Sequence, residues 1–167
     1  MCTGKAFLKE AYHALFQNDF QKAIEAFKKA IRQEPKNPLY YYKLSITYAR
    51  NGDIPLALDA ANQAHELEPE NQNYRYHVQI LQSKYIVYTA SNLMKKHLLT
   101  YELEKMLIRA KELDPLNIEA YLLLGIFYGE NFQLTKAMKE FNKVLQLDPF
   151  HQNAKTLLEH YIKKYSG

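Results

Sequence analysis

The sequence predicts an all-α protein built from consecutive pairs of helices, and three regularities support this prediction. Four acidic–proline dipeptides divide the chain: Glu34-Pro35, Glu68-Pro69, Asp114-Pro115 and Asp148-Pro149. Because proline lacks an amide hydrogen and disfavours helix in the residue before it, each dipeptide ends a helix. Successive prolines are 34, 46 and 34 residues apart. Apolar residues recur at helical spacing between them. Three asparagines are placed to cap the helices that follow: Asn37, Asn71 and Asn117.

The first four helices follow from these signals. Apolar residues predict a helix over about residues 3–17, and Asn18-Asp19 separates it from a partner over residues 20–33. Pro38 suits a first helical position and begins a helix over residues 38–50. Residues 51–53 break the pattern before a helix over residues 54–67, which Asp53 is placed to cap. Small residues on this last helix allow close approach to its partner: Ala57, Ala61 and Ala64.

The third pair is longer than the others by 12 residues. No glycine or proline interrupts residues 73–97, and apolar residues continue throughout. This predicts one helix of roughly 24 residues, about 36 Å long, whose second half projects past its neighbours. The alternative is a loop near Ser91-Asn92 that folds the extra residues back. A second helix follows over residues 101–113.

The last helices are predicted over residues 118–130, 134–147 and 151–165. Gly125 permits a close helix–helix contact in the fourth pair. The final helix is amphipathic, with apolar residues on one side and charged residues on the other. A helix of this kind can cover the exposed end of a stack of helix pairs.

A 34-residue period with this content resembles the tetratricopeptide repeat family. The second repeat carries residues typical of the family's signature positions: Tyr41, Leu44, Ser45, Tyr48, Gly52, Ala57, Ala61, Ala64 and Pro69. The fourth repeat does the same: Tyr121, Leu124, Gly125, Tyr128, Ala137, Phe141, Val144 and Pro149. The resemblance implies a right-handed α-α superhelix of about four helix-turn-helix units plus a C-terminal capping helix. We expect one domain over residues 1–167, with repeats at about 4–37, 38–71, 72–117 and 118–151 and the capping helix at 151–165.

Composition and motifs favour a binding function without catalysis. The net charge of +4 is spread along the chain, with no lysine or arginine run that predicts a nucleic-acid site. The histidines lack metal-ligand spacing, and the sequence has no glycine-rich phosphate loop and no Gly-x-Ser-x-Gly motif. We therefore expect no enzyme activity, no cofactor and no metal site.

Cysteine content and hydropathy bear on location. Cys2 is the single cysteine, which excludes an internal disulfide and fits a reducing, cytoplasmic compartment. The alternative is a processed lipoprotein anchored through Cys2. No apolar run is long enough to span a membrane, and the N-terminus shows no signal-peptide pattern.

In the family that the sequence resembles, the first helices of successive repeats line a concave groove. The resemblance places these residues in it: Leu8, Tyr12, Tyr42, Ile46, Arg50, Tyr76, Ile80, Leu122 and Ile126. The row is mainly apolar and aromatic, and tyrosine is enriched at interaction sites. Tyr12 and Ile46 stand where some members carry polar residues that hold a terminal carboxylate, so that binding mode is disfavoured. The alternative is that the long helix or the last helix folds into the groove and buries the row.

These observations predict a protein-interaction module that binds an apolar or amphipathic peptide in its concave groove. One alternative is a dedicated chaperone of a secreted or membrane-associated partner. Another is a self-assembling structural protein, a homodimer for example, that associates through the helix at residues 73–97. Tyr85, Tyr88 and Met94 would then form the oligomer or partner surface; otherwise this part of the helix packs under the fourth repeat.

Overall fold

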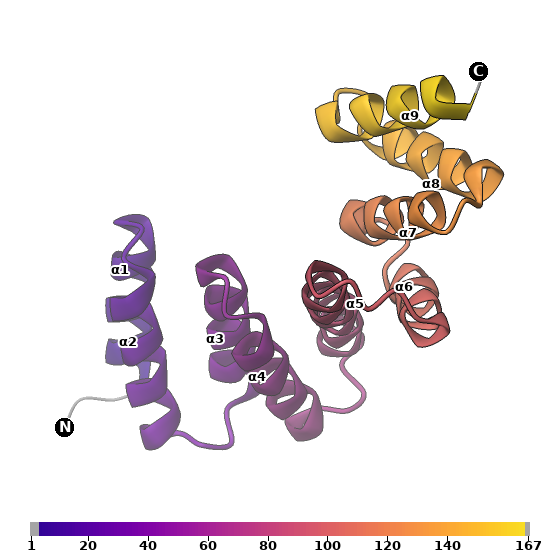
Figure 1. Ribbon diagram of the computed structural model, residues 1–167. Helices are drawn as coiled ribbons and strands as arrows, with labels where there is room; N and C mark the ends of the chain where they lie inside the picture. Colours follow the sequence, from indigo (N-terminus) through magenta and orange to yellow (C-terminus); the bar gives the residue numbers. More distant parts are fainter. Residues whose placement is uncertain (1–3, 166–167) are drawn as a thin grey trace. The chain divides into compact units, whose positions relative to one another are not determined.

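The computed structural model describes residues 4–165, and within this range every regular element is an α-helix (Figure 1). The helices are α1 (Gly4–Phe16), α2 (Phe20–Gln33), α3 (Pro38–Asn51), α4 (Ile54–Leu67), α5 (Gln72–Lys95), α6 (Tyr101–Leu113), α7 (Ile118–Glu130), α8 (Leu134–Leu147) and α9 (Gln152–Tyr165). The prediction of one long helix in the third pair is confirmed, because α5 is continuous, and the loop alternative is wrong. Cys2, the proposed lipid anchor, lies outside the described residues.

The chain forms two compact units, unit 1 (Met1–Gln82) and unit 2 (Ser83–Gly167). The boundary falls inside α5, so residues 72–82 of this helix belong to unit 1 and residues 83–95 belong to unit 2. The extra length of α5 therefore gives one helix two sets of packing partners.

Unit 1 is a series of closely packed helix pairs. In it α1 packs on α2, α2 on α3, and α3 on α4. The contacts are made largely by small side chains, since Ala11, Ala23 and Ala57 are fully buried. Val78 and Leu81 of α5 join the same hydrophobic core.

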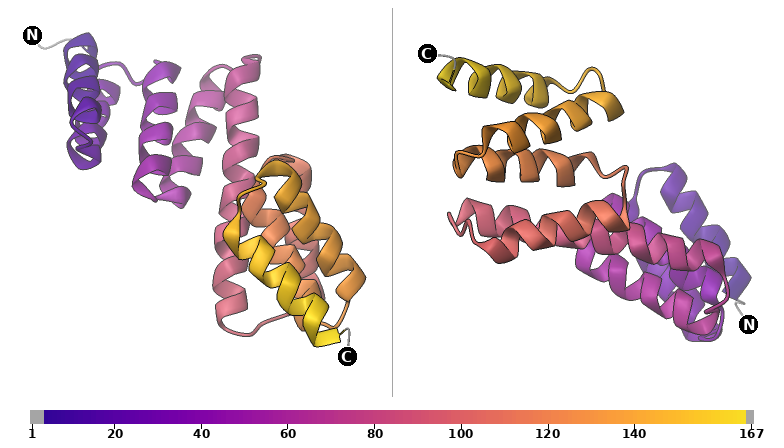
Figure 2. Two further views of the ribbon diagram at one scale, coloured as in Figure 1. Left: turned by 90° about the horizontal axis from the view of Figure 1, so that it is seen from above. Right: turned by 90° about the vertical axis from the view of Figure 1, so that its right-hand side faces the viewer.

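Unit 2 is built around α7, which packs on α6, α8 and α9. Figure 2 shows α7, α8 and α9 as successive layers. The second half of α5 was expected to project past its neighbours, and this prediction is wrong. Val87 and Ala90 are buried in the same core cluster as Leu103 and Leu107 of α6. Their apolar side chains gain more from burial there than from exposure to water.

The predicted asparagine caps are confirmed. Asn37, Asn71 and Asn117 each accept a backbone N–H from the helix that follows, at 3.2, 3.1 and 3.4 Å. Each contact satisfies one of the amide donors that a helix leaves unpaired at its first turn. Asp53 differs, because its carboxylate makes no capping hydrogen bond and instead accepts from the Asn51 side-chain amide at 2.6 Å.

The repeat is visible in a tyrosine contact that recurs in both units. The Tyr41 hydroxyl donates to the Pro35 carbonyl at 3.1 Å, and the Tyr121 hydroxyl donates to the Pro115 carbonyl at 3.2 Å. In both cases the tyrosine lies near the start of the first helix of a pair and ties it to the preceding loop. The hydroxyl groups of both tyrosines therefore have structural partners.

We expect Gly125→Ala to lower the free energy of unfolding by about 1–3 kcal/mol through overpacking. A Cβ at this position would lie 2.6 Å from Cε1 of Phe141, whose ring is fully buried. At an open helical position the same change raises stability by up to about 1 kcal/mol. Urea unfolding followed by circular dichroism measures the difference.

The double variant Gly125→Ala/Phe141→Leu provides the control. If the clash is the cause, the two changes are less destabilising together than the sum of the single changes. A stabilising Gly125→Ala would contradict the close contact between α7 and α8.

Candidate functional site

Unit 1 contains a cavity of about 460 Å³ between α3 and residues 72–82 of α5, with the α4–α5 loop at its rim. We call it the Tyr42 cavity. Its lining residues are Leu39, Tyr42, Asn71, Asn73, Tyr74, Tyr76, His77 and Ile80. Tyr42, Tyr76 and Ile80 were predicted to face the groove, and the structure brings these three together in one hollow. The lining combines aromatic and aliphatic side chains with amide, imidazole and hydroxyl groups, and polar and apolar groups contribute to it about equally.

The Tyr42 ring is fixed by aromatic contacts. Its centroid lies 5.1 Å from that of Tyr74, with the two rings inclined at 44°. The His77 ring meets it nearly edge-on, at 4.9 Å and 76°. Contacts at such distances are favourable for aromatic pairs. The Tyr42 ring is therefore held by contacts with two neighbouring rings.

Tyr74 is the buried member of this cluster. Only 8% of its surface is exposed, whereas Tyr76, two residues along, is 54% exposed. Burial raises the pKa of the Tyr74 hydroxyl, and the nearby Glu68 and Tyr42 raise it further. Tyr74 is therefore a buried part of the cavity wall, whereas the Tyr76 ring is accessible to solvent.

A hydrogen bond joins α3 and α5 beneath the cavity. The Ser45 hydroxyl donates to the Tyr42 carbonyl at 2.8 Å and lies 2.8 Å from Nε2 of His77. The tautomer of His77 sets which of these two groups donates to the other. Ser45 is fully buried, so its hydroxyl has no access to a substrate. The pair therefore fits a structural role and not nucleophilic catalysis.

The other residues predicted in the groove of unit 1 lie outside the Tyr42 cavity. Leu8 is half-buried against the unit 1 core, and Ile46 is half-buried on α3. Tyr12 is 43% exposed and makes an edge-on ring contact with α2. The Arg50 guanidinium lies 5.1 Å from the centre of the Phe20 ring, in a cation–π contact with α2.

The remaining predicted residues belong to unit 2. Leu122 is buried in the core of this unit, and Ile126 packs against the same core. Leu122 therefore offers no exposed side chain to a ligand. On α5, Tyr85 and Tyr88 are 40% and 48% exposed, whereas Met94 packs against the core. The proposed oligomer or partner surface is thereby reduced to the two tyrosines.

Sequence reasoning did not identify Tyr74 and His77 as lining residues. A signal for Tyr74 exists, because Tyr40 precedes it by one repeat period of 34 residues and is also buried. No comparable signal marks His77, since Lys43 occupies the equivalent position one period earlier. Its role depends on how α5 packs against α3.

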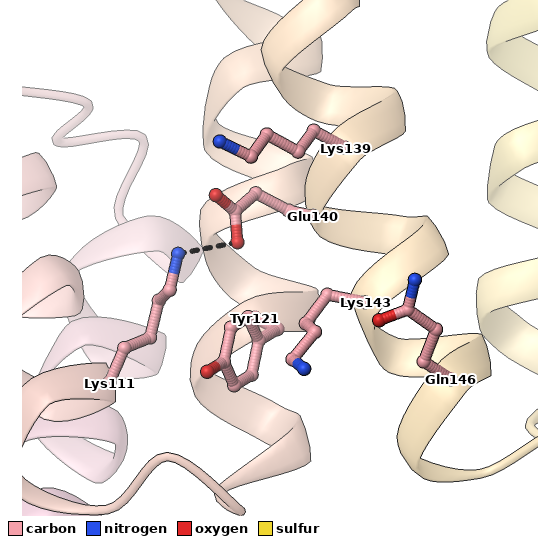
Figure 3. A pocket seen from close by; sticks show the side chains of 6 residues that line it. All are labelled: Lys111, Tyr121, Lys139, Glu140, Lys143 and Gln146. Carbon is pink, nitrogen blue, oxygen red and sulfur yellow. Dashed lines mark hydrogen bonds and ion pairs between the residues drawn. The ribbon is translucent and has the colours of Figure 1, made fainter.

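A second hollow, in unit 2, has different chemistry (Figure 3). It encloses about 370 Å³ between α6, α7 and α8, and we call it the lysine pocket. Its lining residues are Lys111, Tyr121, Lys139, Glu140, Lys143 and Gln146. Burial raises the pKa of the Tyr121 hydroxyl, with further contributions from Glu140 and Asp114. The pocket differs from the Tyr42 cavity in being lined mainly by charged side chains.

The described residues contain no cluster of three or more His, Cys, Asp or Glu side chains that could hold a metal ion. None of the helices at residues 4–165 is both long enough and apolar enough to cross a membrane.

Comparison with known families finds two matches. A family model described as tetratricopeptide repeat matches residues 8–71, and another with the same description matches residues 118–151. Together they cover more than half of the 167 residues. No curated protein sequence matches the chain.

Solved structures with the same fold include helical-repeat proteins. MamA from Desulfovibrio magneticus RS-1, residue 41 to the end, is 21% identical, with a TM-score of 0.58 over 98% of this chain and 85% of that one. YrrB, described as a TPR protein with an unusual peptide-binding site, is 21% identical, with a TM-score of 0.51 over 96% of this chain and 74% of that one. At these identities the likeness concerns the fold, and it confirms the predicted all-α superhelical class.

We expect Ser45→Ala to lower the free energy of unfolding by about 1 kcal/mol, since it removes the link between α3 and α5. A double-mutant cycle with His77→Ala isolates the interaction, and we expect a coupling energy of at least about 0.5 kcal/mol. Thr47→Val is the matched control, because the Thr47 hydroxyl is also buried but bonds the Lys43 carbonyl of its own helix. Additivity of Ser45→Ala and His77→Ala would contradict the link.

Proposed function

Because the chain belongs to the tetratricopeptide repeat family, whose members act as protein-interaction scaffolds, we propose that the Tyr42 cavity is its docking site for an apolar or amphipathic peptide. The observation that carries this proposal is the exposed Tyr76 ring beside the fixed Tyr42 ring in a cavity of about 460 Å³. Cavities of this size that combine apolar surface with placed polar groups are typical of ligand sites.

The rigidity of Tyr42 supports binding. Ordering a side chain at an interface costs free energy, and a ring already held by Tyr74 and His77 loses little freedom when a ligand covers it. Tyrosine also combines a large apolar area with a polar tip. These properties are common in residues that dominate binding energy.

The rim supplies the polar contacts that orient a peptide. Asn71 and Asn73 line the cavity with side-chain amides that can donate to and accept from a peptide backbone. Asn71 uses its Oδ1 atom as a helix cap and its Nδ2 atom to bind Glu68, so Asn73 is the more available of the two. An amphipathic helix would insert residues spaced i, i+3 or i+4 into the hollow.

The two units suggest different roles for the tyrosines of α5. Tyr76 belongs to the Tyr42 cavity, whereas Tyr85 and Tyr88 are exposed outside both hollows. Tyr85 and Tyr88 therefore offer a matched control for aromatic side chains on the same helix. Light scattering of the same variants shows whether these two rings also support self-association.

We expect Tyr76→Ala to weaken peptide binding by about 1–4 kcal/mol. The probes are peptides selected from a displayed random library against the full chain, with affinities measured by calorimetry. Tyr76 is more than half exposed, so its replacement leaves the fold intact. Adding Tyr42→Ala should weaken binding further.

Tyr85→Ala/Tyr88→Ala is the control and should retain the affinity of the unchanged protein. Selected peptides should be rich in aromatic and branched aliphatic residues. Equal affinity of the Tyr76→Ala variant and the unchanged protein for every selected peptide would show that the Tyr42 cavity is not the docking site.

A further inference from the structure

The lysine pocket of unit 2 carries an unusual balance of charge. Three of its six lining residues are lysines, and one is a glutamate. Figure 3 shows Lys139 and Lys143 extending from α8 toward the side of the pocket where Lys111 and Tyr121 lie. The pocket belongs to α6, α7 and α8 and shares no lining residue with the Tyr42 cavity.

Lys111 and Glu140 neutralise each other. Their Nζ and Oε2 atoms are 2.6 Å apart, and the two side chains are only 20% and 10% exposed. This ion pair is therefore well shielded from water. The Lys111 ammonium group also lies 4.6 Å from the centre of the Tyr121 ring, in a cation–π contact. Lys111 is therefore held both by the ion pair and by the aromatic ring.

Lys139 and Lys143 are left without a counter-charge. They lie four residues apart on one face of α8, and neither has an acidic partner among the described residues. Like charges at this spacing repel. Lys136, one turn earlier on the same helix, differs because it lies 4.0 Å from Glu104 and contacts the Tyr128 ring. With three lysines and one glutamate, the lining has a formal net charge of +2.

We propose that the lysine pocket binds the anionic group of an acidic peptide segment, a carboxylate or a phosphate, between Lys139 and Lys143. An anion there relieves the repulsion between the two lysines and accepts charge-assisted hydrogen bonds from both. Gln146, at the edge of the pocket, adds an amide donor. The volume of about 370 Å³ accommodates more than a single small ion, so flanking groups of the segment can contact the Tyr121 ring.

This second site differs from the Tyr42 cavity in charge. The Tyr42 cavity is lined by uncharged aromatic, aliphatic and amide side chains together with His77, whereas the lysine pocket has three lysines and one glutamate. The two proposals are independent, because one depends on aromatic rings of unit 1 and the other on lysines of unit 2. Either can fail without the other.

The test uses the full chain and three labelled peptides of equal length: one rich in glutamate, one carrying phosphoserines, and one with glutamine at the same positions. Fluorescence anisotropy measures binding at low and moderate salt. We expect the acidic peptides, but not the glutamine peptide, to bind, with affinity falling as salt rises. Lys139→Ala/Lys143→Ala should weaken binding at least about tenfold, and Lys139→Arg/Lys143→Arg should retain it.

Lys95→Ala/Lys96→Ala is the matched control, because it removes the same charge from exposed residues outside the pocket. It should change affinity less than about threefold, since only screened long-range attraction is lost. The Lys139→Ala/Lys143→Ala variant should unfold at the same or a higher urea concentration, because a like-charge pair is removed.

Comparison of the glutamate and phosphoserine peptides identifies the preferred anion. Absence of binding for both acidic peptides would overturn the proposal. An equal loss of affinity in the pocket variant and the control variant would overturn it as well, because it would indicate attraction by overall charge alone. If the Tyr76→Ala variant no longer binds the apolar peptides but still binds the acidic peptides, the two sites are separate.

Discussion

The close approach of paired helices through alanine is the constraint on which the rest of the structure depends. Ala11 and Ala23 are fully buried where α1 meets α2, and Ala57 is fully buried where α4 packs on α3. A large side chain at these positions would force the axes apart, since interaxial distance follows the residues at the contact. Gly125 shows the same constraint at its limit, because even a methyl group there would collide with Phe141. Tyrosines occur in both environments, since Tyr40 is buried in the core and Tyr76 is exposed.

The two proposed binding sites lie between helices. At the edge between α3 and α5, Tyr42, Tyr74 and His77 form a fixed ring cluster, and Tyr76 remains exposed beside it. At the edge between α6 and α8, a buried lysine–glutamate pair leaves two further lysines uncompensated. The long α5 allows both arrangements in one chain, because it supplies core residues to unit 1 and to unit 2. The result is two hollows that differ in charge, each supported by its own core.

Much of the fold could be predicted because its signals are local. Proline and asparagine fix helix ends within a few residues, and α2, α4, α6, α7 and α8 begin and end where the sequence predicts. Interactions between distant residues could not be predicted in this way. Lys111 and Glu140 are 29 positions apart, and their pairing depends on how α6 packs beside α8. The Ser45–His77 contact likewise depends on how the helices pack. The burial of Val87 against α6 also depends on packing, because the continuous apolar pattern of α5 does not indicate which helix covers it.

The central claim is that the Tyr42 cavity is preformed and receives an apolar peptide. Nuclear magnetic resonance of the full chain, titrated with a selected apolar peptide, tests it most directly. The account predicts the largest chemical-shift changes at Leu39, Tyr42, Tyr76 and Ile80. It also predicts that nuclear Overhauser contacts between the Tyr42 and Tyr74 rings are present in the free protein and persist on binding. Shift changes confined to other residues, or a ring contact that forms only on binding, would contradict it.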